Sequence, residues 1–314
     1  MASPSAGFPK VYILLLNYRG ANDTLACLDS LRHLTYPNFQ IVVIDNASPD
    51  DSVNRLQARL TTNPGEFHLI VSPQNLGFSG GNNLGIGWAL RQSEHDAFIW
   101  LLNNDTVVKP ETLTPLVREA LKTGGLAGSL LLYPDGSYQQ VGTRINWWSG
   151  GAKGYRESQV TDGMPVETLT GASMLIPFSA IRNVGLMDAS FFLYFEDGEY
   201  SLRCARAGFP LTVATQSRVF HKEGATTGRK SLPTQYYFHR NRMRVLFMYA
   251  SLPQKCAIGL YAVFRMLRSV VKLGMNTAVE RSEMRASTCV QWLALVDFWK
   301  GMSGPCPHKL ENLQ

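Results

Sequence analysis

The sequence has few cysteines, and none of them are spaced to bind a metal or form a redox pair. Its 314 residues include five cysteines, an odd and scattered set without a CxxC pair. Disulfide frameworks use even numbers of cysteines in short secreted chains, and zinc sites use closely spaced ones. The pattern therefore argues against a disulfide-stapled scaffold and favours a reducing, cytoplasmic compartment.

Long hydrophobic runs are also missing. A spanning helix needs about 20 predominantly apolar residues in a row. The nearest candidate, residues 256–271, is interrupted by Arg265 and Arg268. The opening residues hold no basic cluster followed by an apolar stretch. We therefore expect neither a transmembrane helix nor a cleaved secretory signal.

Charged residues are somewhat scarce at 17%, whereas 45% of the chain is hydrophobic, as in a folded globular protein. The net charge of +6 is unevenly placed, because residues 218–285 hold 13 basic and three acidic side chains, a local excess of +10. Such a block suits nucleic acid, a phosphate-rich ligand or an anionic membrane face. The chain has no RRM, KH or zinc signature, so we expect no nucleic-acid partner.

Short apolar runs alternate with helical patterns through the first 122 residues. This alternation is typical of an α/β fold, in which a mainly parallel sheet has helices on both faces. Residues 126–219 are less regular, and from residue 234 the sequence becomes helical and basic. The predicted strands are 11–16, 41–44, 67–71 and 98–102, and the predicted helices are 22–34, 50–60, 79–91 and 110–122.

Polar residues follow all four predicted strands. They are residues 17–19, 45–48, 72–77 and 103–105. Ligands bind beyond the carboxyl ends of the strands in sheets of this kind. The four segments together therefore predict one binding site at that edge.

Two groups within the sequence could carry chemistry. Asp105, after Asn103 and Asn104, could hold a divalent metal on a phosphate, although an Asx turn explains the tripeptide equally well. Glu196 and Asp197 follow the aromatic residues 191–195. Adjacent carboxylates with apolar neighbours raise one another's pKa, which suits a general base. The alternative is a helix N-terminus whose acidic residues are favoured by the helix dipole.

Two further features leave alternatives open. His221 follows a predicted strand, residues 211–219, and could complete a metal site, contact a phosphate or be an ordinary surface group. The glycine-rich stretch 73–83 precedes a predicted helix. It matches neither GxGxxG nor GxxxxGK[ST], which argues against a dinucleotide site or a P-loop.

Taken together, these stretches resemble the inverting glycosyltransferases of family 2, which have a GT-A fold. The similarity covers residues 10–250, and residues 75–83 and 237–242 look most like bacterial rhamnosyltransferases of surface polysaccharide assembly. The matching pieces are residues 15–18, 43–48, 75–83, 102–105, 170–176 and 195–197.

The resemblance implies a Rossmann-like GT-A catalytic domain over residues 1–230, with a mixed, mainly parallel sheet. Its nucleotide-sugar half would span residues 10–105, and its acceptor half residues 106–230. A basic helical region, residues 231–314, would form a C-terminal extension.

The resemblance also implies roles for individual residues. Asp197 matches the catalytic base, and Glu196 would hold acceptor or donor hydroxyls. Asp105 matches the last position of the metal-binding DxD motif. Asn103 stands where the motif has its first aspartate, which removes one anionic ligand. His221 would be a further metal ligand. The acceptor would meet Gly171, Ala172 and Trp147, and the nucleotide would meet Asn17, Arg19, Asp45, Asn46, Gln74, Asn75, Gly80 and Asn104.

The implied reaction is a single displacement that inverts the sugar, assisted by Mg²⁺ or Mn²⁺. The implied donor is dTDP-L-rhamnose, and the acceptor is a bacterial surface glycan or lipid-linked glycan at the inner face of the cytoplasmic membrane. Alternatives are a UDP- or GDP-sugar donor and a non-catalytic nucleotide-sugar binding module. A nucleotidyltransferase is disfavoured, because residues 17–20 are too short and poor in glycine for its loop.

Within residues 231–285, basic side chains alternate with apolar ones. This pattern predicts a peripheral contact with an anionic membrane face. The alternatives are a solvated face of a helical bundle and arginines that bind the donor diphosphate or a phosphorylated acceptor.

Overall fold

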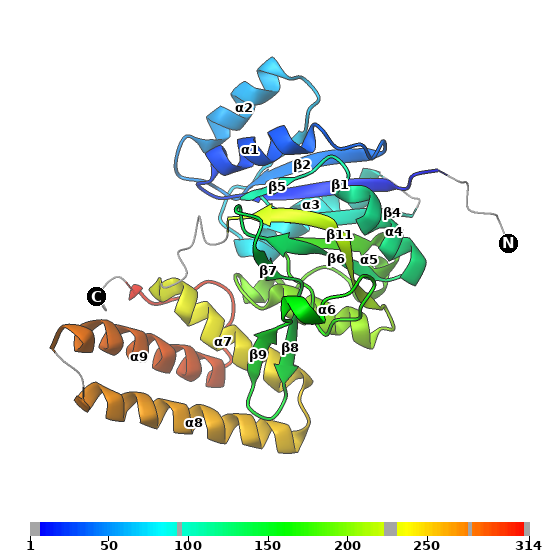
Figure 1. Ribbon diagram of the computed structural model, residues 1–314. Helices are drawn as coiled ribbons and strands as arrows, with labels where there is room; N and C mark the ends of the chain where they lie inside the picture. Colours follow the sequence, from blue (N-terminus) through cyan, green and yellow to red (C-terminus); the bar gives the residue numbers. More distant parts are fainter. Residues whose placement is uncertain (1–6, 93–95, 223–230, 276–277, 311–314) are drawn as a thin grey trace.

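The computed structural model describes residues 7–92, 96–222, 231–275 and 278–310. A central sheet carries helices on both faces, and three C-terminal helices form a group beside it (Figure 1). The strands are β1 (Lys10–Asn17), β2 (Phe39–Asp45), β3 (His68–Val71), β4 (Ala97–Asn103), β5 (Thr106–Val108), β6 (Leu126–Leu132), β7 (Tyr138–Gln140), β8 (Thr143–Asn146), β9 (Gly151–Gly154), β10 (Ser173–Pro177) and β11 (Leu211–His221). The helices are α1 (Ala21–Leu31), α2 (Ser52–Thr62), α3 (Gly77–Gln92), α4 (Leu113–Thr123), α5 (Phe178–Val184), α6 (Glu196–Arg206), α7 (Leu232–Tyr249), α8 (Leu252–Met275) and α9 (Ala278–Trp299).

The main sheet has the strand order β3-β2-β1-β4-β10-β6-β11-β5, with β7 paired to β6. Strands β3, β2, β1 and β4 are parallel, whereas β10 runs antiparallel between β4 and β6. In register, Asn17 lies opposite Asp45, and Leu16 lies opposite Asn103. The polar residues that follow these three strands therefore meet at one edge. The predicted mixed, mainly parallel sheet is confirmed.

The parallel strands are apolar throughout because both of their faces are buried. Val11, Ile13 and Leu15 of β1 belong to the core beneath α1, α2 and α4. Tyr12 and Leu14 belong to the core on the opposite face, which includes α3 and α5. This explains why the strands appear in the sequence as short continuous apolar runs, without the alternation of a half-exposed strand.

The glycine-rich stretch forms the first part of α3, and it brings that helix close to the sheet. A Cβ on Gly81 would lie 2.4 Å from Leu16 Cδ1, and one on Gly85 would lie 2.8 Å from Ile44 Cδ1. Gly77 has a φ of +71°, and a Cβ there would meet the Phe192 carbonyl oxygen at 2.2 Å. The helix therefore begins at Gly77, two residues before the predicted start, and these glycines serve close packing.

The C-terminal helices are attached to the sheet domain through α7. Helix α9 packs against both α7 and α8, and α8 lies at the outer edge of the group (Figure 1). The predicted helical extension is confirmed, and the residue bounds of the two predicted domain halves stay a prediction. Within the described residues, none of the helices is long and apolar enough to cross a bilayer.

Candidate active site

A cavity of about 1040 Å³ lies at the carboxyl edge of the sheet. Its walls come from the ends of β1, β2, β4 and β11, the start of α3, the segment 168–172, the aromatic segment 192–195 and the face of α7. Most of the predicted site residues line it. They are Arg19, Asn46, Asn75, Asn103, Asn104, Asp105, Gly171, Ala172, Glu196, Asp197 and His221.

Asn17 and Asp45 lie beneath the cavity wall and are fully buried. Asn17 Nδ2 donates to Asp45 Oδ2 at 2.7 Å, and the backbone N–H of Ser48 donates to Asp45 Oδ1 at 2.9 Å. Thr24 Oγ1 donates to Asn17 Oδ1 at 2.9 Å and accepts from Asn104 Nδ2 at 2.9 Å. These bonds tie the ends of β1, β2 and β4 together, and direct contact of Asn17 and Asp45 with a nucleotide stays a prediction.

Asn46 and Asn75 shape the loop that enters α3. Asn46 Nδ2 donates to Asn75 Oδ1 and to the Gly77 carbonyl, each at 3.0 Å, and its Oδ1 accepts from the backbone N–H of Leu76 at 2.9 Å. Asn75 Oδ1 also accepts from the backbone N–H of Gly77 at 2.9 Å. The two amides thus hold the start of the helix at the cavity rim.

Three predicted binding residues lie away from the cavity lining. Gln74 is exposed on the loop before α3, and Gly80 is buried within α3, where a Cβ would meet Leu76 Cβ at 2.8 Å. Trp147 donates from Nε1 to Glu167 Oε1 at 2.7 Å and lines a separate small hollow beside Arg206. None of the three therefore lines the cavity with the other predicted residues.

Asp105, His221 and Asn103 form the predicted metal-binding group. His221 Nε2 lies 3.2 Å from Asp105 Oδ1 and 3.3 Å from Asn103 Nδ2, and His221 Nδ1 pairs with Gln139 Oε1 at 2.9 Å. Asp105 Oδ1 is buried without hydrogen-bond geometry to any described atom. Among the described residues no three His, Cys, Asp or Glu side chains come together. A carboxylate, an imidazole and an amide suit Mn²⁺ whose other ligands come from a diphosphate and water.

Glu196 and Asp197 open α6, where the helix dipole favours negative charge. Asp197 is half-buried, and it accepts from the backbone N–H groups of Gly171 at 2.8 Å and Gly198 at 2.7 Å. Burial raises the pKa of Asp197, and these two bonds oppose the rise. Burial and the charge of Asp197 raise the pKa of Glu196 well above its usual value. Asp197 is therefore the stronger acid of the pair and carries its negative charge.

Replacing Glu196 by glutamine is expected to stabilise the fold at neutral pH. Glu196 is 5% exposed, and its Oε2 has no hydrogen-bond partner. Because the pKa of Glu196 is raised in the folded state, the folded protein keeps a proton on this side chain that the unfolded chain releases above pH ~4.5. The free energy of unfolding therefore falls as the pH rises from that point, and glutamine, which does not titrate, avoids this loss. Thermal melts of both proteins should diverge with rising pH; a constant or inverted difference would contradict the raised pKa.

The aromatic segment before Glu196 has a strained backbone. Phe192, Tyr194 and Phe195 have φ values of 66°, 64° and 70°, a region that non-glycine residues seldom occupy. The Phe192 carbonyl accepts from the backbone N–H of Phe78 at 2.6 Å, which joins the segment to α3. Arg19, at the opposite wall, also has a positive φ of 58°. Such strain persists only where surrounding contacts fix the backbone, and it gathers at functional sites.

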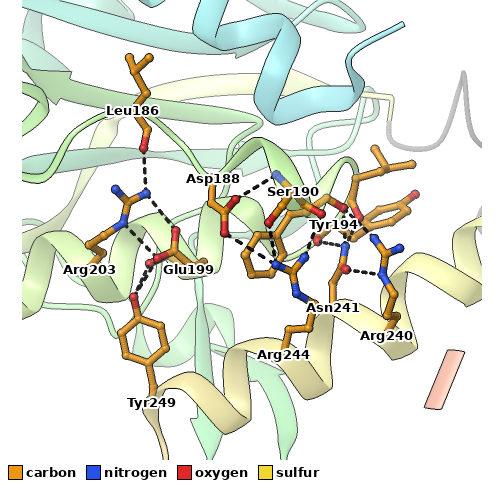
Figure 2. A network of polar contacts seen from close by, with 12 residues as sticks. Leu186, Asp188, Ser190, Tyr194, Glu199, Arg203, Arg240, Asn241, Arg244 and Tyr249 are labelled. Carbon is orange, nitrogen blue, oxygen red and sulfur yellow. Dashed lines mark hydrogen bonds and ion pairs between the residues drawn. The ribbon is translucent and has the colours of Figure 1, made fainter. Parts of the chain in front are cut away.

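Helix α7 supplies the contacts that fix this segment (Figure 2). Asn241 Nδ2 donates to the carbonyls of Phe191, Leu193 and Tyr194 at 2.8, 2.7 and 3.0 Å. Figure 2 also shows Arg240 beside Asn241 and Arg244 reaching Ser190. Asn241, buried Arg240 and half-buried Arg244 therefore hold the segment that leads to Asp197.

Replacing Asn241 by alanine is expected to lower the free energy of unfolding by about 3 kcal/mol. The side chain is fully buried, and its loss removes one amide donor from each of three carbonyls, those of Phe191, Leu193 and Tyr194. Chemical denaturation measures this. Asn241→Asp keeps the size but turns an oxygen toward those carbonyls, so it should be at least as destabilising; a neutral effect of either variant would contradict the role of the amide.

Sequence reasoning missed several lining residues, including Phe78, Phe192, Tyr237 and Phe238. The aromatic run 191–195 was visible as an apolar neighbour of the carboxylates, but its backbone conformation had no local signal. Tyr237 and Phe238 lie far along the chain, and α7 brings them to the cavity.

Three proteins of known role have sequences similar to this chain. The O-antigen biosynthesis protein RfbC of Myxococcus xanthus is 26% identical over 75% of this chain, which spans 19% of that protein. The low-salt glycan biosynthesis hexosyltransferase Agl10 of Haloferax volcanii is 24% identical, with 73% of each chain covered. The N-acetylglucosaminyl-diphospho-decaprenol L-rhamnosyltransferase of Mycobacterium tuberculosis is 26% identical over 64% of this chain and 72% of its own length.

Solved structures share the fold. A crystal structure of GalNAc-T7 with UDP, GalNAc and Mn²⁺ has a TM-score of 0.64 at 14% identity, covering 94% of this chain and 57% of that chain. The mannosyltransferase PcManGT of Pyrobaculum calidifontis, in complex with GDP-Man and Mn²⁺, has a TM-score of 0.57 at 12% identity, covering 95% and 90%. The fold is therefore GT-A-like.

The family model described as Glycosyl transferase family 2 matches residues 12–185, more than half of the chain. That range includes β1 from Tyr12 onward, the strands β2 to β4, Asp105, and the strand β10 that follows Ala172. With the matching fold and the polar cavity at the sheet edge, the chain belongs to glycosyltransferase family 2.

Proposed function

We propose that the protein transfers a sugar from a nucleoside diphosphate to a hydroxyl of a surface glycan, with inversion at the anomeric carbon. The observation that carries this proposal is one cavity that holds both a half-buried carboxylate, Asp197, and the paired side chains of Asp105 and His221, which we propose as metal ligands. A binding module would need only the second group, so the presence of Asp197 favours catalysis.

Asp197 is the general base. The backbone N–H groups of Gly171 and Gly198 hold its carboxylate in one orientation and favour its charged form. It takes the proton of the acceptor hydroxyl as that oxygen bonds to the anomeric carbon. The bond from the anomeric carbon to the diphosphate oxygen breaks on the opposite face, and its electron pair leaves with the nucleoside diphosphate. One base suffices, because the leaving group needs neutralised charge and no proton.

Asp105 and His221 would hold the divalent metal, with Asn103 as a neutral neighbour. A bound Mg²⁺ or Mn²⁺ would offset the charge that develops on the departing diphosphate. Gln139 orients the ring by pairing with His221 Nδ1, which leaves Nε2 facing Asp105. Asn103 contributes no charge, so this chain would hold the metal with a single carboxylate, that of Asp105.

We propose dTDP-L-rhamnose as the donor and a lipid-linked glycan at the cytoplasmic membrane face as the acceptor. Support comes from the relative whose name is that of a diphospho-decaprenol rhamnosyltransferase, and from the O-antigen relative. The solved structures contain UDP and GDP-Man, so UDP- and GDP-sugars are the alternatives. The exposed apolar face of α8 beside Arg265 and Arg268 supports a peripheral contact with an anionic membrane.

Titration of dTDP, UDP and GDP, each with and without Mn²⁺, tests the proposal. Metal-dependent binding with dTDP tightest supports the donor and the metal site. Tighter binding of UDP or GDP would keep the transferase and discard rhamnose as the sugar. If none of the three nucleotides binds, the proposed transferase is overturned, and so is the alternative of a nucleotide-sugar binding module.

A further inference from the structure

A second group of basic side chains is carried by α7 and α8, outside the polar edge of the sheet. His239 and Arg242 are three residues apart on α7 and therefore share a face of that helix. Arg265 of α8 lies near enough that its charge acts on both. The pKa of His239 falls to about 4 through burial and the charges of the two arginines. The pKa of Arg242 falls to about 10 through burial and the charge of Arg265.

Arg242 differs from the other arginines of α7. Arg240 and Arg244 donate to Phe191 and Ser190, as described above. Arg242 is half-buried, and its Nε is shielded from water without a hydrogen-bond partner. The ion pairs recorded among the described side chains include neither Arg242 nor Arg265, and Arg265 is exposed. A desolvated guanidinium without a counter-charge, such as that of Arg242, is costly, and an anion beside it would remove that cost.

The outer face of α8 next to this group is apolar. Leu260, Phe264 and Leu267 are 74%, 59% and 58% exposed, and their spacing places them along one stripe of the helix. Ile258 and Met266, on the side toward the protein, are buried. An exposed apolar stripe of this kind marks an interaction site. A ligand that combines an anionic group with a hydrocarbon chain would satisfy both features.

The basic group also adjoins the candidate active site. His239 follows Phe238, and their rings are 5.8 Å apart. Phe238 lines the cavity and packs edge-on against Phe195 at 5.1 Å, directly before Glu196 and Asp197. An anion held at the basic group is therefore one side chain away from the cavity wall.

We propose that His239, Arg242 and Arg265 bind the phosphate group of a lipid-linked acceptor, whose hydrocarbon chain lies along α8. This inference rests on the proposed function and names the part of the acceptor that the protein recognises outside the reacting sugar. Two arginines suit a diphosphate, because each guanidinium can donate two parallel hydrogen bonds to phosphate oxygens. Neutral His239 adds a single donor.

Binding of farnesyl diphosphate to the full-length protein tests this inference without requiring turnover. Calorimetry should show binding to the wild type and a dissociation constant about tenfold weaker for Arg242→Gln and for Arg265→Gln. Arg268→Gln is the matched control, because Arg268 is exposed on the same helix and loses the same charge. It should bind as the wild type does. Farnesol, which keeps the chain without the charge, should bind at least tenfold more weakly.

The outcomes separate this inference from the proposed function. Equal binding by all three variants, or equal binding of farnesol and farnesyl diphosphate, would overturn the phosphate site while nucleotide binding persists. Preference for phosphatidylglycerol vesicles over farnesyl diphosphate, lost equally in Arg265→Gln and Arg268→Gln, would replace the acceptor with a general membrane contact. Failure of the wild-type protein to bind any of the three nucleotides would overturn the proposed function itself. Thermal melts of the variants exclude unfolding as the cause.

Discussion

Asp197→Asn is expected to lower the rate of sugar transfer about a thousandfold, since positioned general bases contribute factors of this size. The asparagine can still accept from the backbone N–H of Gly171, so the start of α6 should keep its place. The dissociation constant of the nucleotide should change by less than about twofold, because the variant removes a proton acceptor and no proposed nucleotide contact. Transfer assays and nucleotide titration on the same preparation measure both quantities.

Glu196→Gln is the matched control for that variant. Burial and the charge of Asp197 raise the pKa of Glu196 and favour its protonated form, which glutamine resembles, so transfer should fall by no more than a few-fold. Because the pKa of Asp197 is raised, activity should decline with falling pH, and the decline should occur at a higher pH than the usual pKa of an aspartate. Similar losses in both variants, or loss of nucleotide binding in Asp197→Asn, would contradict the assigned base.

Asp105→Asn should weaken Mn²⁺ binding about a hundredfold, the upper end of the effect usual for altering a residue behind a metal ligand. Asp105 is the only carboxylate of the predicted metal group, and its buried Oδ1 has no hydrogen-bond partner among the described atoms. Asn103→Asp should act in the opposite direction, because it supplies a second anionic ligand beside His221. Calorimetric titration of Mn²⁺ in the presence of dTDP measures the affinity of each variant directly.

The pair of variants makes this test independent of catalysis. If Asp105→Asn binds Mn²⁺ as tightly as the wild type, the metal lies elsewhere or is not needed. If Asn103→Asp binds it more weakly, the side chain of residue 103 does not face the metal. The first result would remove Asp105 and His221 from the proposed mechanism and leave Asp197 as the base. The second would remove only residue 103 from the metal site.

Much of the fold followed from local patterns. The four early strands and their helices were predictable, because strands buried on both faces are continuously apolar and the helices between them repeat every three to four residues. The edge of polar residues followed from the parallel arrangement alone. The start of α3 was misplaced, since the glycines that look like a loop are in fact required where the helix touches Leu16 and Ile44.

The rest depends on contacts between distant parts of the chain. The positive φ values of Phe192 and Tyr194 have no sequence signal. Asn241, nearly 50 residues later, stabilises this backbone by donating to the carbonyls of residues 191, 193 and 194. The basic C-terminal block was equally ambiguous. The structure divides it into buried arginines such as Arg240, which position the site, and exposed ones such as Arg268 on α8. Composition cannot distinguish the two.

The anomeric configuration of the product tests the central claim most directly. Proton NMR of the sugar transferred by the wild-type protein, compared with that of Asp197→Asn, reports both the stereochemistry and the need for the base. The account predicts a product of configuration opposite to that of the donor, formed about a thousandfold more slowly by the variant. A product with retained configuration, or undiminished transfer by Asp197→Asn, would contradict it.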